Sequence, residues 1–487
     1  MAAFTIAHIS DLHFSQGADE TTPHRHSIPH LKLIQQTLNN EPIDKLIVSG
    51  DLTNMGDKES LLRVRDWLFG EFSISADEKL GLNLRTNLVS VVPGNHDAYN
   101  AKRSPGGYQE CWQKSIANYR EIFPHPQTIS GCTFDWLEKD GRGIYIAYVD
   151  SCFLGDPELQ HLKGFRNALI HQVGKVARGK LSISQSNQLV AWFDLGMTGE
   201  LINPNNETSK IPKGKFAQSF KILVMQHYLF EPEGFKDDFF LKIQHRDTVF
   251  RNIALADFDM YLCGHKHVSD FSHYLYGQHF DRWAKGRYLM NLFRRRLGAN
   301  TLPYQFKDSE GKMTSSWLSR FLEIAILKQR SEQVDETTFI ESLMDVIRNC
   351  VTNPAKFGAD LENFVRTHEL SGQPFLDADE IQEIHTRICS QLSKKEREVL
   401  TQTGLIYISR MVKKMNARPF IHSMCGSSAK ASNSSQTLRN FNIYKFEISN
   451  QLCRVTRTRF DLQLPKVSKA TDHFEFANHH QVALRQA

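Results

Sequence analysis

Short apolar stretches rich in β-branched residues alternate with amphipathic stretches through the first 275 residues of the chain. The apolar stretches are typical of buried strands, and they predict strands at residues 4–9, 46–48, 88–92, 143–149, 222–225 and 260–263. Apolar residues recur at helical spacing at 30–38, 59–69 and 184–193, and Ser182 and Ser184 are candidate caps for the last of these helices. This alternation predicts an α/β fold whose functional residues gather where strands end.

The pattern changes near residue 276, where strand-like stretches give way to helical periodicity. Trp317, Phe321, Ile324 and Leu327 form one apolar helical stripe, and such a stripe needs a partner to cover it. Alternating apolar and polar residues return at 420–424, 441–448 and 452–460. The predicted domains are a core at 1–275, an all-helical insertion domain at 276–417, a closing β-hairpin of the core at 418–465, and a loosely held polar C-terminal tail at 466–487.

Composition narrows the class of protein without identifying it. The 487 residues are 40% hydrophobic and 23% charged, with a formal net charge of +5, which is ordinary for a globular protein and small for this length. The eight cysteines are scattered and form no Cys-x-x-Cys pair, as expected in a reducing compartment. No secretory signal and no membrane-spanning run is recognisable, so the sequence predicts a soluble cytoplasmic protein.

Five polar motifs each follow a predicted strand. They are Asp11-Leu12-His13, Gly50-Asp51, Gly94-Asn95-His96-Asp97, His227 and Gly264-His265-Lys266-His267. Together they supply carboxylates, an amide and several imidazoles, which are the ligands that two neighbouring divalent cations need. The absence of thiolates from this set favours Mn, Fe or Zn at a reactive site over a structural zinc.

The order and residue types of these motifs resemble the calcineurin-like metallophosphoesterase superfamily. The Asp-x-His start and the Gly-Asn-His-Asp form look most like its class III cyclic-nucleotide phosphodiesterase branch, and the resemblance covers about 1–275 and 418–463. It implies a four-layer α/β/β/α sandwich, interrupted here by the helical insertion.

The resemblance also implies two overlapping sets of metal ligands. The first-ion set would be Asp11, His13, Asp51 and His267. The second-ion set would be Asp51, Asn95, His227 and His265, with Asp51 bridging the two divalent ions. His96 resembles the family's histidine that is not a ligand and protonates the leaving group, and Asp97 is a candidate for orienting it.

The function implied is hydrolysis of a phosphodiester by a metal-bridging hydroxide, with His96 as general acid and a 3′,5′-cyclic nucleotide as one candidate substrate. A metal-dependent nuclease is an alternative, because six basic residues cluster at 282–296 and nucleic acid would suit them. A regulatory protein is another, in which the insertion binds a protein partner and gates the core. The sequence leaves the native metals, the oligomeric state and the role of the insertion open, and we expect no membrane association.

Overall fold

The computed structural model of the chain describes residues 2–15, 27–75, 77–82, 84–98, 107–123, 131–152, 179–230, 243, 258–275, 306–307, 313–314, 353–367, 382, 419–428, 439–449 and 452–477. The chain divides into two compact units, of which unit 1 contains Met1–Tyr274 and Pro419–Gln486 and unit 2 contains Leu275–Arg418. Among the described residues, no helix is both long and apolar enough to cross a membrane.

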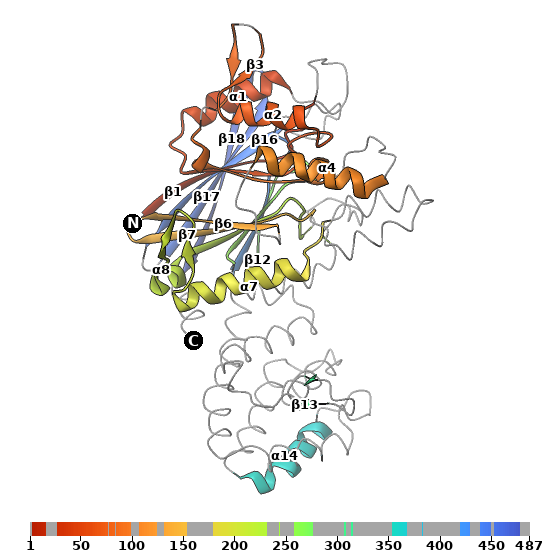
Figure 1. The fold of residues 1–487 in the computed structure, drawn as a ribbon. Coiled ribbons are helices and arrows are strands. Elements are labelled where there is room, and N and C mark those ends of the chain that lie inside the picture. Colours follow the sequence, from red (N-terminus) through yellow and green to blue (C-terminus); the bar gives the residue numbers. More distant parts are fainter. Residues whose placement is uncertain are drawn as a thin grey trace. The chain divides into compact units, whose positions relative to one another are not determined.

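Unit 1 is built on two six-stranded sheets (Figure 1). From edge to edge, the first sheet contains β18 (Lys466–Ala477), β17 (Leu452–Gln463), β16 (Asn440–Ile448), β1 (Ala2–Ile9), β2 (Lys45–Ser49) and β5 (Val89–Val92). The strands β1, β2 and β5 are parallel, whereas β16, β17 and β18 continue the sheet in antiparallel order. The first three polar motifs follow β1, β2 and β5, so they lie together at the carboxyl ends of these parallel strands.

The second sheet carries the remaining two motifs. From edge to edge it contains β12 (Asp270–Leu275), β15 (Pro419–Met424), β11 (Met260–Cys263), β10 (Phe220–Val224), β7 (Arg142–Val149) and β6 (Cys132–Lys139). The strands β7, β10, β11 and β15 are parallel. Because β10 and β11 are parallel, the segments that follow them lie at the same end of the strands.

Helices pack on both sheets, with α1, α2 and α4 on one side of the strands and α7 and α8 on the other (Figure 1). Their bounds are α1 Ile28–Asn39, α2 Lys58–Leu68, α3 Asn95–Ala98, α4 Gly107–Ile122, α7 Ile183–Thr198 and α8 Lys213–Gln218. Smaller elements are the 3₁₀ helix η1 Thr86–Leu88 and the paired strands β3 Phe72–Ser73, β4 Lys79–Leu80, β8 Ile202–Asn203 and β9 Asn206–Lys210. The predicted cap Ser182 is confirmed, since it forms a reciprocal capping box with Gln185 at the start of α7.

Two apolar cores explain why the sheets and helices assemble. Side chains such as Phe4 on β1 and Ile222 on β10 bury between the two sheets. A second core joins the other face of the first sheet to its helices, with Leu61 and Trp67 of α2 packed against strand residues such as Val48. The predicted mixed α/β class is confirmed; the four-layer order stays a prediction, which these two cores support.

The predicted polar tail is wrong for the segment Lys466–Ala477, because these residues form β18 and pair with β17 along their whole length. The segment is polar because it lies at a sheet edge, where charged residues such as Lys469 and Glu475 are exposed. On its other face Phe474 packs against the inter-sheet core. Polarity at alternate positions therefore marked an edge strand and not a loose tail.

Unit 2 is described only in part. Its described elements are α14 (Pro354–Thr367) and the short antiparallel pair β13 (Phe306–Lys307) and β14 (Met313–Thr314). In α14, Leu361 and Phe364 are buried, as expected for one face of an amphipathic helix. The prediction that the insertion is all-helical is wrong at β13 and β14. The rest of the predicted insertion, including the basic cluster at 282–296, lies outside the described residues.

A buried ion pair joins the two sheets of unit 1. Lys45 Nζ on β2 lies 2.7 Å from Asp135 Oδ2 on β6, and Ser90 Oγ donates to the same oxygen at 2.8 Å. Burial alone would raise the pKa of Asp135, but the charge of Lys45 and these hydrogen bonds hold it below its usual value. The pair therefore favours one alignment of the sheets that carry the motifs.

We predict that Asp135→Ala lowers the free energy of unfolding by about 3 kcal/mol at neutral pH, because it leaves the buried ammonium of Lys45 without its carboxylate. The double variant Lys45→Met/Asp135→Leu should recover most of this loss, since both charges are gone. Because the folded-state pKa of Asp135 is lowered, its contribution is present above the unfolded pKa of about 4 and is lost as the pH falls through the folded value. Urea unfolding of the variants measures these differences; equal losses in the single and double variants would contradict the assignment.

Candidate metal centre

The first two motif loops continue side by side beyond the ends of β1 and β2. Asp11 N donates to Gly50 O at 3.1 Å, and His13 N donates to Asp51 O at 3.0 Å. The pairing ends in an isolated bridge between Phe14 and Thr53. These backbone bonds fix the two carboxylates and the first imidazole on neighbouring segments of chain.

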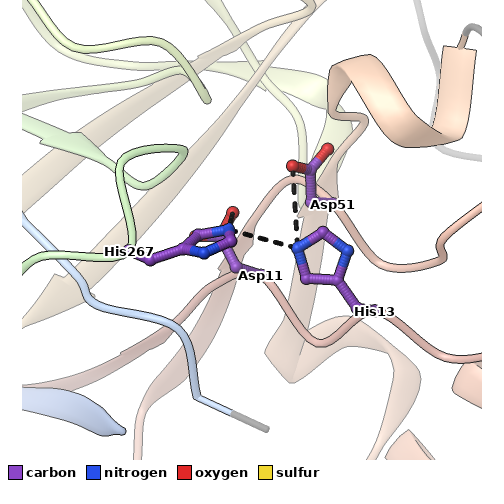
Figure 2. Close-up of side chains that lie close together, drawn as sticks. All are labelled: Asp11, His13, Asp51 and His267. Atoms are coloured by element: carbon purple, nitrogen blue, oxygen red, sulfur yellow. Dashed lines mark hydrogen bonds and ion pairs between the residues drawn. The ribbon is translucent and has the colours of Figure 1, made fainter. Parts of the chain in front are cut away.

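All four members of the first-ion set meet at one point. One ligand atom from each of Asp11, His13, Asp51 and His267 lies within 4.8 Å of the other three (Figure 2). His267 Nε2 is 3.3 Å from Asp11 Oδ1, and His13 Nε2 is 3.2 Å from His267 Nε2. A divalent ion with ligand bonds of about 2.1 Å needs donors within roughly 4.2 Å of one another, so small side-chain movements suffice to hold one.

The backbone at these positions adopts a conformation that side chains usually avoid. Among the described residues, six other than glycine have positive φ, and five of them are predicted ligands: Asp11 (53°), His13 (51°), Asp51 (46°), His265 (73°) and His267 (57°). Such conformations persist only where the surroundings enforce them, and they concentrate at functional sites. The left-handed residues turn successive side chains out of the strand pattern, which lets His265 and His267 leave the same short loop in different directions.

Two glycines provide the space for this geometry. A Cβ atom on Gly264 would lie 1.8 Å from Ser10 Oγ and 2.7 Å from Asp11 Oδ2. A Cβ atom on Gly94 would lie 2.2 Å from the backbone nitrogen of Asp51. The loops can approach one another this closely only because both positions lack side chains.

Asp11 is held as an anion with one oxygen kept for another partner. Its Oδ2 accepts hydrogen bonds from Ser10 Oγ at 2.7 Å and from the backbone N–H of His265 at 3.1 Å. Burial would raise the pKa of Asp11, but His267 and these donors together lower it. Its Oδ1 is buried and lies 3.3 Å from His267 Nε2, which fits two ligands of one metal ion.

Asp51 shares this buried region with a like charge. Burial and the charge of Asp11 raise the pKa of Asp51, while His96 opposes the shift. The backbone N–H of His96 donates to Asp51 Oδ1 at 3.0 Å, and His13 Nε2 lies 3.9 Å from Asp51 Oδ2. Two neighbouring buried carboxylates call for compensating positive charge, which divalent cations would supply.

Asn54 positions both the ligand His13 and the predicted acid His96. Its side-chain oxygen lies 2.9 Å from His13 Nδ1, and its carbonyl oxygen lies 3.1 Å from His96 Nδ1. An amide or carbonyl oxygen can only accept, so Nδ1 carries the hydrogen in each ring. His13 Nε2 is thereby available to a cation, as the first-ion set requires.

The second-ion set is held by a separate group of hydrogen bonds. The rings of His227 and His265 lie side by side, with centroids 4.4 Å apart. Ser151 Oγ lies 2.8 Å from His227 Nδ1, and Asn95 is hydrogen-bonded to Gln226 through both its backbone and its side chain. Asn95 also stands between Gly94 and His96, both of which lie against Asp51, the residue predicted to bridge the two ions.

The predicted role of Asp97 as the residue that orients His96 needs correction. The Asp97 carboxylate accepts hydrogen bonds from Leu52 N, Thr53 N, Thr53 Oγ1 and Gly94 N at 2.8–3.0 Å, and none from His96. Burial and the charge of Asp51 raise its pKa to about 7 against the effect of these donors. Asp97 therefore ties the second motif loop to the third, and the backbone of Asn54 contacts His96 in its place.

Sequence reasoning missed the residues that orient the predicted ligands: Asn54, Ser151, Gln226 and Ser427, whose Oγ donates to Asp11 O at 3.0 Å. The only available signal was proximity, since Asn54 lies three residues after Asp51 and Gln226 directly precedes His227. Ser427 contacts Asp11 across 416 positions of sequence, and its only signal was its place in the Ser-rich segment 426–436, which the family resemblance predicts as a loop near the site.

Comparison with known families agrees with this geometry. The family model for calcineurin-like phosphoesterases matches residues 4–269, which is more than half of the chain and includes all five motifs. No curated protein matches the chain.

We predict that Asp97→Asn lowers the free energy of unfolding by about 2 kcal/mol and weakens metal binding, because an amide would turn its NH₂ group toward N–H donors that the carboxylate now satisfies. Thermal unfolding and metal content of the purified variant measure the two effects. Asp57→Asn is the matched control, since Asp57 caps α2 by accepting from Ser60 N and asparagine caps equally well. An Asp97→Asn protein with unchanged stability and metal content but slower turnover would restore the catalytic role.

Proposed function

The chain belongs to the calcineurin-like phosphoesterase family, and we propose that it hydrolyses a phosphodiester at a centre of two divalent metal ions. Because this family consists of phosphoesterases, the chain is a hydrolase of phosphoric esters. The site's donors, its electrostatics and the position of His96 support the more specific reaction.

The observation that carries the proposal is the convergence of Asp11, His13, Asp51 and His267 within 4.8 Å. A cluster of carboxylates and imidazoles without thiolate suits Mn, Fe or Zn. When bound, two such ions supply a hydroxide nucleophile at neutral pH and neutralise charge on the phosphoryl oxygens. Asp51 would bridge the ions, and Asn95, His227 and His265 would complete the second-ion set.

In this proposal His96 protonates the leaving group. Its ring lies beside that of His13, with centroids 5.0 Å apart, and it is only partly buried. Because Nδ1 donates to the Asn54 carbonyl, Nε2 is the ring atom that exchanges a proton. A protonated His96 would donate from Nε2 to the departing alkoxide and return to the neutral tautomer that Asn54 favours.

The intact Gly94-Asn95-His96-Asp97 motif supports a diesterase or a general phosphoesterase, because the alkoxide that leaves a phosphate ester needs a proton. The resemblance to the class III phosphodiesterase branch makes a 3′,5′-cyclic nucleotide the first candidate to test.

The proposal predicts that the purified protein hydrolyses bis(p-nitrophenyl) phosphate when Mn²⁺ is present and stops when a chelator is added. Asp51→Asn should abolish turnover by removing the bridging carboxylate, and its metal content should fall. Asp140→Asn is a matched control, since Asp140 also has positive φ, 49°, but is exposed in the turn between β6 and β7. Turnover that survives both the chelator and Asp51→Asn would disprove a metal-dependent reaction. Cyclic nucleotides and DNA are the substrates to compare next.

A second expectation concerns proton transfer. His96→Ala should keep both metal ions and lose about 10²–10⁴-fold in rate, the usual contribution of a general acid. The loss should be smaller for a substrate whose leaving group needs no proton, such as a nitrophenolate, than for an alkyl diester. His473→Ala, an exposed histidine on β18, controls for the loss of an imidazole as such. An unchanged rate with the alkyl diester would remove His96 from the mechanism.

A further inference from the structure

The side chain of Gln226 lies between two of the motif loops, and its backbone contacts a third. It is fully buried and directly precedes His227. A Cβ atom on Gly50 would lie 2.6 Å from Gln226 Cγ, and one on Gly94 would lie 2.6 Å from Gln226 Nε2. The backbone oxygen of Gln226 accepts from Gly264 N at 3.0 Å.

Gln226 forms a closed pair of hydrogen bonds with one residue of the second-ion set. The backbone N–H of Asn95 donates to Gln226 Oε1 at 2.7 Å, and Gln226 Nε2 donates to Asn95 Oδ1 at 3.3 Å. The side chain of Gln226 thus contacts both the backbone and the amide group of Asn95.

The donors around Gln226 determine which way both amides face. A backbone N–H can only donate, so the group of Gln226 that meets Asn95 N must be its oxygen. The Cys152 thiol, 3.7 Å from the same oxygen, agrees with this orientation, because burial raises the pKa of Cys152 and keeps its hydrogen in place. The NH₂ group of Gln226 therefore faces the Asn95 side chain and must meet its oxygen, Oδ1.

We propose that Gln226 is the positioning residue that presents the oxygen of Asn95, and not its nitrogen, to the second metal ion. An amide oxygen has two lone pairs, so the hydrogen bond from Gln226 leaves one for an ion. An amide turned by half a rotation would offer an NH₂ group, which cannot coordinate a cation. This inference rests on the proposed dinuclear centre and adds the residue that selects the amide rotamer.

The test is a calorimetric titration of metal-free protein with Mn²⁺. The wild type should bind two ions per chain. Gln226→Met keeps the length of the side chain and removes both hydrogen-bonding groups, so the second dissociation constant should rise about 10–100-fold, as it does when an outer partner of a ligand is lost. Binding of the first ion, which uses Asp11, His13, Asp51 and His267, should be unchanged and serves as a control within the same titration. Gln226→Glu, which keeps an acceptor for Asn95 N but loses the donor, gives a second variant if Gln226→Met folds poorly.

A second background separates orientation from general support. Aspartate has oxygen at both ends of its side-chain group, so Asn95→Asp should bind two ions whichever way the group turns. In that background Gln226→Met should leave the second dissociation constant within about threefold, instead of raising it 10–100-fold.

Each other outcome overturns the proposal. Gln226→Met with two ions bound at wild-type affinity would show that Gln226 does not matter to Asn95. Equal weakening in the wild-type and Asn95→Asp backgrounds would make Gln226 a structural support only. Loss of the second ion from Asn95→Asp alone would show that presenting an oxygen at position 95 is not what binds this ion. Failure of the proposed function would look different, since the wild type itself would then bind no ions.

Discussion

The centre depends on left-handed backbone at its ligands. Each such residue costs on the order of 1–3 kcal/mol, and the cost is tolerated only where neighbouring structure leaves no alternative. Here the neighbours are other motif loops: Asp11 N donates to Gly50 O, His13 N donates to Asp51 O, and Gly264 N donates to Gln226 O. These bonds join neighbouring motif loops, so the conformation of each loop depends on the loop beside it.

This dependence includes residues more than 400 positions further along the chain. Ser427 Oγ donates to Asp11 O. Ser428 N donates to Ser10 O at 2.9 Å, and Ser10 N donates to Ser428 Oγ at 3.1 Å. Both serines follow β15, by which the chain returns to unit 1 after Leu275–Arg418. Because β15 is parallel to β11, these serines lie at the same end of the strands as His265 and His267. The first motif is thus completed by residues that are synthesised after the whole of unit 2.

The sequence predicted what depends on local pattern. The strand at 260–263 has the predicted bounds, because an apolar run ending in Gly264 is a local signal. The sequence pattern failed where contacts between residues distant in sequence determine the structure. Asp97 was paired with its neighbour His96, yet successive side chains on the short helix α3 point about 100° apart and meet different partners. The polar sequence of β18 resembled a tail because its pairing with β17 cannot be read from the sequence. No sequence pattern indicated a role for Gln226.

The two proposed ligand sets differ in charge. The first-ion set has two carboxylates, so Coulomb attraction alone draws a cation to it. The proposed second-ion set shares Asp51 and otherwise consists of neutral groups, whose affinity depends on lone pairs that point the right way. Ser151 and Gln226 contact His227 and Asn95 in this second set. Fixed orientation therefore matters most in the proposed second set, where charge is scarce, and we expect sequential filling with the charged set first.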